Sequence, residues 1–301
     1  MSSVRTPATL FAVALMWFTG CGDEGGISDS TSATTGAPNA ADDERAGRTD
    51  ASCDASSPVV PGEYELRHTF GGVEQSYVAV VPETYDPKTP AHVYIVVPGG
   101  SGSAQAARAG WGPNLAGVDA IVVFADVGNP ATRTVPMIRA LIDDVADRHC
   151  VDRSRVYATG GSASAGFTAR LMADASDVIA AFAPGIGTFG TTGLDPIGPV
   201  PLIAWSGDLD RAQVERSVAE WAIANGCATE PTSSDLGSGI VHHHYEDCAA
   251  STEFYDFVGM GHQVPSHDCS GVGPQYCAEY EEFDFWKDVG SFFDAHPLPA
   301  P

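Results

Sequence analysis

A serine flanked by small residues follows a predicted strand, in the segment 158–166, which reads Ala-Thr-Gly-Gly-Ser-Ala-Ser-Ala-Gly. A nucleophilic serine on a sharp strand-to-helix turn needs small residues two positions before and two positions after it, because strand and helix approach closely there. Gly160 and Ser164 meet this requirement around Ser162. We therefore expect Ser162 to be a nucleophile. Ser164 is the alternative nucleophile, and a glycine-rich turn without chemistry is the alternative role of the segment.

An aspartate and a histidine follow the serine in the chain, each just after a predicted strand. Asp210 lies in the acidic turn after the apolar run 202–205, with Asp208 as the alternative acid, and His262 ends a Gly-x-Gly-His loop. The order serine, aspartate, histidine is that of α/β-hydrolases. We expect Asp210 to orient the imidazole of His262, and His262 to act as the general base toward Ser162. A capping or turn role is the alternative for either aspartate.

A nucleophilic attack on a carbonyl also needs two fixed N–H donors for the oxyanion that develops. The backbone amide of Ala163 directly follows the nucleophile and has the position of the first donor. The second donor is expected from the loop after an early strand, and the glycine-rich segment 98–103 has free amides there. We favour Gly100 as this donor and Gly99 as the next choice, while a plain glycine turn is the alternative role of the loop.

The elements that must position these residues alternate between short β-rich runs and segments of helical period. Apolar residues recur at helical spacing in three segments, 138–145, 214–222 and 285–293. The alternation predicts an α/β fold, with a mostly parallel central sheet and helices on both faces in a single domain. The predicted strands are 77–81, 93–97, 120–124, 156–158, 179–182, 202–205 and 254–257.

The N-terminal segment has the features of an export signal. A basic residue precedes an apolar run that is shorter than the ~20 residues needed to cross a bilayer, so residues 1–20 are expected to be a signal peptide. The sequence Phe-Thr-Gly-Cys that ends this segment resembles the lipobox of bacterial lipoproteins, which implies lipidation of Cys21; an ordinary secreted protein is the alternative. Residues 21–57 have almost no large apolar side chains and are expected to form a flexible acidic tether, leaving 58–301 as the folded domain.

The charge of the chain excludes some partners. The formal net charge is −24 for the whole chain, and 31 acidic against 12 basic residues give −19 for residues 58–301. Such a surface repels phosphate backbones and anionic lipids, so we exclude nucleic acid as a partner. Membrane attachment is expected only through the lipid on Cys21.

Six cysteines besides Cys21 remain, and an even number in an exported chain indicates disulfides. The absence of a Cys-x-x-Cys pair argues against a zinc ribbon and a thioredoxin-like site. Six cysteines allow fifteen pairings. We expect two local closures and a third bond that ties the end of the tether to the domain, namely Cys227–Cys248, Cys269–Cys277 and Cys53–Cys150.

A run of three histidines, 242–244, is a type of segment that can bind a metal ion. Neighbouring side chains in a strand point to opposite faces, so the three imidazoles cannot converge on one ion if the segment is a strand. We therefore expect no metal site.

Several stretches of the domain resemble the esterase family that contains polyhydroxybutyrate depolymerases, feruloyl esterases and acetylxylan esterases. Residues 77–85 are similar to its Tyr-x-Val-x-x-Pro-x-x-Tyr opening, and residues 151–160 to its Val-Asp-x-x-Arg-Val-Tyr-x-Thr-Gly lead into the serine. Gly-x-x-Asp at 207–210 and Gly-x-Gly-His at 259–262 also match. The chain departs from the family at three places: Pro98 and Ser206 stand where the family has histidines, and Ser164-Ala165 replaces its paired glycines.

The resemblance implies an exported serine esterase that forms an acyl-enzyme and needs no cofactor. Its expected substrate is a polymer-linked ester, with feruloyl or acetyl groups on plant polysaccharide first and polyhydroxyalkanoate second. The departures from the family motif motivate a hypothesis of another class, a catalytically silent surface lipoprotein that uses the same fold for binding.

Overall fold

The computed structural model describes Cys53 and residues 59–100, 102–128 and 133–300. The expected signal peptide, the expected lipidation site Cys21 and all of the expected tether except Cys53 lie outside the described residues. Within the described part of the chain, no helix has the length and apolar character that crossing a membrane requires.

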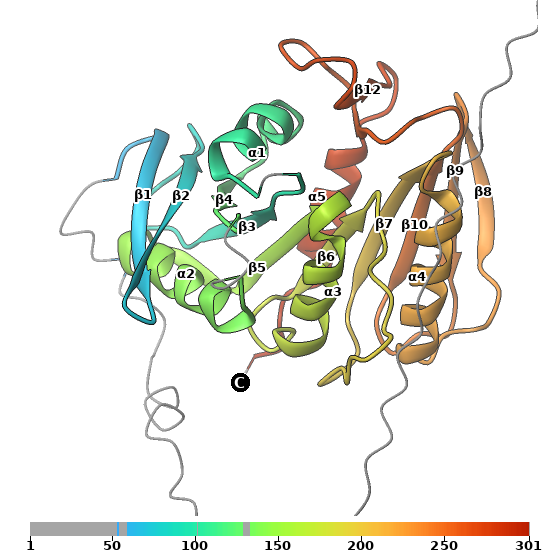
Figure 1. The fold of residues 1–301 in the computed structure, drawn as a ribbon, viewed down its shortest axis with the longest axis horizontal. Coiled ribbons are helices and arrows are strands. Elements are labelled where there is room, and N and C mark those ends of the chain that lie inside the picture. Colours follow the sequence, from blue (N-terminus) through green and yellow to red (C-terminus); the bar gives the residue numbers. More distant parts are fainter. Residues whose placement is uncertain (1–52, 54–58, 101, 129–132, 301) are drawn as a thin grey trace, which may run out of the picture. The chain divides into compact units, whose positions relative to one another are not determined.

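The domain is built on a ten-stranded sheet with the order β1-β2-β4-β3-β5-β6-β7-β10-β9-β8 (Figure 1). The six central strands from β4 to β10 run parallel, and antiparallel strands extend the sheet at both edges. The expected mostly parallel sheet is thereby confirmed. The strands are β1 (Gly62–Phe70), β2 (Val73–Val81), β3 (Ala91–Val97), β4 (Ala120–Ala125), β5 (Val151–Gly161), β6 (Ala181–Gly185), β7 (Leu202–Gly207), β8 (Thr232–Gly237), β9 (Ile240–Tyr245) and β10 (Thr252–Phe257), with a separate pair β11 (Val264–Ser266) and β12 (Cys277–Glu279).

Helices cover both faces of this sheet, as expected. The first face packs against α2, α3 and α4, and the second packs against α1 and α5. Each face has its own cluster of buried apolar side chains, because the central strands are apolar on both sides. The helices are α1 (Ala104–Trp111), α2 (Val135–Arg148), α3 (Ala165–Asp174), α4 (Arg211–Ala224) and α5 (Phe285–Ala295), with short 3-10 turns η2 (Gly112–Leu115) and η3 (Ser162–Ser164).

The predicted helical stripes are confirmed as the buried faces of α2, α4 and α5. In α2, Ile138, Leu141, Ile142 and Val145 are all at most 4% exposed. The helix begins after Thr134, whose hydroxyl accepts a hydrogen bond from the backbone N–H of Met137 and so satisfies one of the free amides of the first turn.

The sheet differs from the predicted one in strand boundaries and at its edges. The strand expected at 179–182 begins only at Ala181, because the N–H of Ile179 bonds back to the carbonyl oxygen of Ala175 in a turn. The strand β5 is much longer than the predicted 156–158. The strand β8 is exposed at every position, so it has no apolar alternation and forms through pairing with β9.

Three disulfides join the six described cysteines: Cys53–Cys150, Cys227–Cys248 and Cys269–Cys277. These are the pairings that the sequence predicts. The second bond closes the segment between α4 and β10, and the third closes the loop between β11 and β12.

A polar contact on the first face fastens α2 to the antiparallel edge of the sheet. Asp144 of α2 accepts a hydrogen bond from the Tyr77 hydroxyl of β2 at 2.7 Å and from Arg148 Nε at 2.7 Å. Arg148 also donates to the carbonyl oxygen of Arg67 on β1. Burial alone would raise the pKa of Asp144, but the hydrogen bonds from Arg148 and Tyr77 bring this pKa below its ordinary value.

Replacing Asp144 with Ala is expected to lower the free energy of unfolding by about 2 kcal/mol at pH 7, because a charged acceptor is lost from two donors. A lowered pKa in the folded state means that the charge-dependent stabilisation is fully present above pH ~4 and is lost as the pH falls through the folded-state pKa. Urea denaturation of both proteins at pH 7 and pH 3 measures this difference. Asp195→Ala, at an exposed position, is the control. If the difference in free energy of unfolding between the wild type and Asp144→Ala stayed constant or widened at pH 3, the charge of Asp144 would not be the source of the stabilisation.

Candidate active site

The turn between β5 and α3 holds Ser162 in a backbone conformation that is rare for residues with a Cβ atom. Its φ is 55°, in the left-handed region. The preceding glycines are required by packing, since a Cβ on Gly160 would lie 2.3 Å from Thr168 Oγ1, and one on Gly161 would lie 2.5 Å from the carbonyl oxygen of Gly185. This is the sharp turn between small residues that the sequence predicts.

A chain of hydrogen bonds links Ser162, His262 and Asp210. The Nε2 atom of His262 lies 2.8 Å from Ser162 Oγ, and its Nδ1 atom lies 2.6 Å from Asp210 Oδ2. The three residues follow β5, β10 and β7, whose parallel strands end at the same edge of the sheet. Asp210 is 5% exposed, whereas the His262 side chain is 44% exposed. A buried acid, an accessible imidazole and a serine hydroxyl are thus aligned at one edge.

The two aspartates of the acidic turn have different partners. Asp210 bonds to His262 and also accepts a hydrogen bond from the Gln213 side chain. Asp208, the alternative acid, instead accepts a hydrogen bond from the backbone N–H of Gly259 at 3.1 Å and pairs with Arg211. Asp208 therefore holds the loop that precedes the histidine and does not contact the imidazole.

Gln263, which the sequence analysis did not single out, braces the histidine loop from the other side. Its Oε1 atom accepts a hydrogen bond from the backbone N–H of Gly261 at 3.0 Å, and its Nε2 atom donates to the carbonyl oxygen of Cys277 at 3.2 Å. Cys277 is bonded to Cys269, so the side chain connects the histidine loop to a segment closed by a disulfide.

The glycine-rich loop after β3 lies against the serine turn. A Cβ on Gly99 would lie 2.9 Å from Ser162 Cβ and 3.6 Å from the amide nitrogen of Ala163. Gly100 has a φ of 60°, and a Cβ there would meet no atom within 4 Å. Of the two candidate donors of this loop, Gly99 is therefore the one in close contact with the turn, while Gly100 provides its bend.

Two of the three departures from the esterase motif contact each other. Ser164, the alternative nucleophile, is 1% exposed, and its hydroxyl donates a hydrogen bond to the carbonyl oxygen of Pro98. The serine that replaces a family glycine thus ties the turn to the glycine-rich loop. Ser206, the third departure, is fully buried on β7, and its hydroxyl has no hydrogen-bond partner among the described residues.

The segment after β6 contacts the serine turn, and the sequence analysis did not predict this contact. The carbonyl oxygen of Ile186 accepts a hydrogen bond from the backbone N–H of Ser162 at 2.9 Å. Ile186 has a φ of 39°, a strained conformation for a β-branched residue. A Cβ on Gly187 would lie 2.9 Å from the carbonyl oxygen of Ser162. The paired glycines at 185 and 187, directly after a predicted strand, are the signal that could have revealed this support.

The three consecutive histidines lie on β9, and their side chains alternate between the faces of the sheet as predicted. His242 contacts Glu253 at 2.9 Å and stacks on Tyr255, while His243 stacks on Phe254. Across the described residues, no group of three or more histidine, cysteine, aspartate or glutamate side chains is arranged to hold a metal ion.

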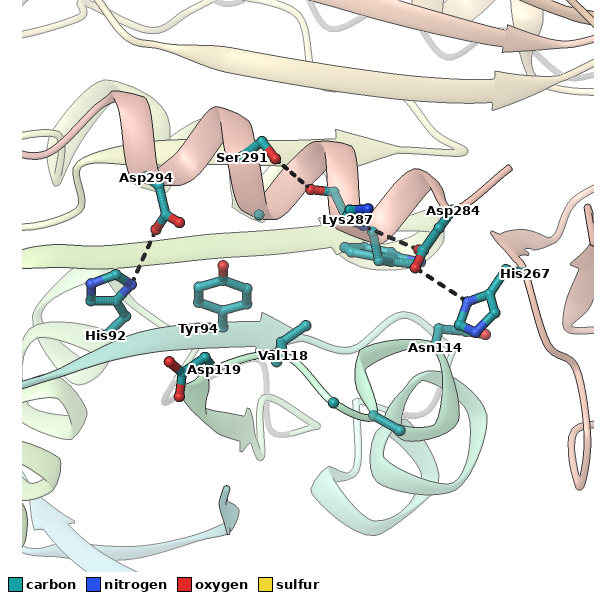
Figure 2. A pocket seen from close by; sticks show the side chains of 14 residues that line it. His92, Tyr94, Asn114, Val118, Asp119, His267, Asp284, Lys287, Ser291 and Asp294 are labelled. Atoms are coloured by element: carbon teal, nitrogen blue, oxygen red, sulfur yellow. Dashed lines mark hydrogen bonds and ion pairs between the residues drawn. The ribbon is translucent and has the colours of Figure 1, made fainter. Parts of the chain in front are cut away.

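A polar cavity of about 400 Å³ lies over β3, between η2 and α5. Figure 2 shows Tyr94 rising from β3 toward α5, with His92 and Asp294 at one end of the cavity and His267 and Asp284 at the other. Burial, and then the charge of Asp294, raises the pKa of Tyr94 and keeps its hydroxyl protonated. The cavity is lined by none of the three aligned residues of the candidate active site.

Comparisons with known proteins find similarity to esterases. The chain is 28% identical over 176 residues to a poly(3-hydroxyalkanoate) depolymerase C from Paucimonas lemoignei, a match that spans 46% of this chain and 42% of that protein. It is 28% identical over 138 residues to a feruloyl esterase B from Piromyces equi, spanning 38% of this chain and 25% of that protein. The chain is similar to these two esterases over less than half of its own length. It therefore spans less than half the length of the curated relatives it matches, and no family model matches it.

The fold of the domain is that of an α/β-hydrolase. An acetyl xylan esterase from Aspergillus awamori superimposes with a TM-score of 0.51 at 15% identity, covering 67% of this chain and 94% of the other. The fold and the family resemblance expected from the sequence are both confirmed.

Replacing Ser164 with Ala is expected to lower the free energy of unfolding by about 1–3 kcal/mol, because the Pro98 carbonyl oxygen would lose a buried donor. Urea denaturation at pH 7 measures the change. Ser291→Ala is the matched control, since that hydroxyl bonds to a carbonyl oxygen on the exposed side of α5 and should change stability by less than about 0.5 kcal/mol. Equal stability of the two variants would show that the contact between Ser164 and Pro98 contributes nothing.

Proposed function

We propose that this domain is a serine carboxylic ester hydrolase in which Ser162 is the nucleophile, His262 the general base and Asp210 the acid that orients it. The observation that carries the proposal is the pair of contacts at 2.8 and 2.6 Å from Ser162 through His262 to Asp210. The left-handed turn of Ser162 and its place at the ends of parallel strands are the further support.

The acylation step follows from this arrangement. His262 Nε2 removes the proton of Ser162 Oγ as the oxygen attacks the ester carbonyl carbon, and the buried carboxylate of Asp210 stabilises the imidazolium that forms. The amide of Ala163 and an amide of the glycine-rich loop, from Gly100 or the adjacent Gly99, donate hydrogen bonds to the oxyanion. His262 then returns the proton to the leaving alcohol, which departs and leaves an acyl group on the serine.

The second step restores the enzyme. A water molecule takes the place of the alcohol, and His262 removes one of its protons as the water attacks the acyl-enzyme carbonyl carbon. Collapse of the oxyanion releases the carboxylic acid and returns the proton to Ser162 Oγ. Every proton in this cycle passes through one imidazole, so the sequence of steps requires no cofactor.

The substrate class is proposed from the relatives. Their names concern feruloyl esters and poly(3-hydroxyalkanoate), both of which are esters of hydroxylated molecules that occur in polymers. We infer feruloyl or acetyl esters of plant polysaccharide as the first substrate class and polyhydroxyalkanoate as the second. Export through a signal peptide in residues 1–20 and anchoring through a lipid on Cys21 belong to the same proposal, as does the division into a tether at 21–57 and a domain at 58–301.

Replacement of Ser162 with Ala is expected to lower kcat/KM on p-nitrophenyl butyrate and on methyl ferulate by at least about a thousandfold, because no acyl-enzyme can form. Spectrophotometric assays of both esters measure this loss. In the wild type, the ratio of kcat/KM for the two esters shows whether a short aliphatic or a feruloyl acyl group is preferred.

Asp210→Asn and Asp208→Asn form a matched pair in the same assays. The first variant loses the carboxylate that contacts His262. The second affects a support of the loop and an ion pair with Arg211, neither of which contacts the imidazole. The loss of activity should therefore be far larger for Asp210→Asn. The reverse order would assign the acid to Asp208.

A silent binding protein with this fold is the alternative function, motivated by the departures at Pro98, Ser164 and Ser206. A fluorophosphonate probe separates the two, because it labels a serine only when a base activates it. Labelling of the wild type but not of Ser162→Ala supports the esterase, and an unlabelled wild type supports the binding protein.

A further inference from the structure

A cavity of about 530 Å³ lies between the beginning of α2 and the helix α3, which follows the serine turn. Arg133 and Thr134 line it just before α2, and Val135 and Pro136 line it from the first turn of that helix. Gly166 and Phe167 line it from the first turn of α3, which starts three residues after Ser162. The two helices follow β4 and β5, which belong to the parallel part of the sheet and end at the same edge. The cavity therefore begins near the edge where Ser162, His262 and Asp210 meet, and it extends along α3 to Asp174.

Arg133 in this cavity is unusual among the basic residues of a strongly acidic domain. Of the ten arginines in the described part of the chain, only Arg133 and Arg216 form no ion pair with a described residue. Arg216 is exposed on α4, whereas Arg133 is half-buried. The arginines in ion pairs are Arg67, Arg108, Arg139, Arg148, Arg153, Arg155, Arg170 and Arg211.

The guanidinium of Arg133 is held in place by an aromatic ring. Its Cζ atom lies 5.9 Å from the ring centroid of Phe167, a cation–π contact that orients the group without neutralising its charge. The other charged residues of the cavity, Arg170 and Asp174, lie 3.5 Å apart and balance each other. The cavity thus has one uncompensated positive charge, while residues 58–301 as a whole have a formal charge of −19.

We propose that Arg133 forms a subsite for a carboxylate group of the ester substrate, so that the domain prefers acidic esters. Arginine suits this role because its planar donors match the two oxygens of a carboxylate. The methylene or ring portion of such a substrate would lie against Phe167. The subsite rests on the proposed esterase function. It would favour acidic over neutral esters, although the distant acidic groups of the domain repel acidic esters.

Paired esters that differ only in one carboxylate test this subsite. On the acyl side, p-nitrophenyl half-esters of succinate, adipate and suberate are compared with the same compounds capped as methyl esters. On the alcohol side, acetyl esters of hydroxybenzoic acids are compared with those of methyl hydroxybenzoates. The ratio of kcat/KM for the acidic over the neutral member is measured in the wild type, Arg133→Gln, Arg133→Lys and the control Arg216→Gln.

The ratio is expected to fall about tenfold or more in Arg133→Gln in at least one series, and that series identifies which side of the ester carries the carboxylate. Arg133→Lys should retain part of the ratio, and Arg216→Gln should leave it unchanged. An unchanged ratio in Arg133→Gln across both series would overturn the proposal.

Binding of suberate to Ser162→Ala by calorimetry keeps the subsite distinguishable from the esterase function. Loss of binding in the double variant Ser162→Ala/Arg133→Gln supports the subsite even if the wild type hydrolyses none of the esters, a result that would count against the esterase function alone. Equal binding by both proteins, or binding by neither, would overturn the subsite.

Discussion

The left-handed backbone of Ser162 is the constraint on which the arrangement of the site depends. A residue with a Cβ atom adopts this conformation only where its surroundings fix it. Here three glycines lie in close contact with the turn or its neighbours. Gly99 of the loop after β3 lies against Ser162, Gly161 lies against the carbonyl oxygen at the end of β6, and Gly187 lies against the carbonyl oxygen of Ser162. Each approach leaves no room for a side chain, so the strands at the centre of the sheet converge on one residue. That convergence points the serine hydroxyl away from the sheet and toward His262.

The acid and the base are fixed by a different kind of interaction, in which polar side chains brace irregular loops. Asp208 and Gln263 both hold the backbone that precedes His262. Gln263 also connects this loop to Cys277 in the segment closed by a disulfide. A half-exposed imidazole is thereby kept in line with a buried carboxylate without being packed in a core. Exposure on one side leaves the ring open to substrate and water, which the proposed acylation and deacylation both require.

The sequence predicts the parts of this site that depend on local chemistry. Glycines around a serine and the order serine, aspartate, histidine are visible in a linear chain, and the apolar stripes of α2 and α4 reveal the layers of the fold. The features that could not be predicted from the sequence depend on contacts between segments far apart in the chain. The left-handed Ile186 is supported by its bond to Ser162, and β8 exists because β9 pairs with it. The contact between Ser164 and Pro98 joins positions that look like unrelated departures from the family motif. No local pattern marks such pairs.

The most direct test of the central claim is to trap the acyl-enzyme. The wild type is mixed with excess p-nitrophenyl butyrate, quenched in acid within milliseconds to seconds, digested and examined by tandem mass spectrometry. The account predicts a butyryl group on Ser162, formed together with a burst of p-nitrophenol and absent from Ser162→Ala. A butyryl group on Ser164, or turnover without any acylated serine, would contradict it.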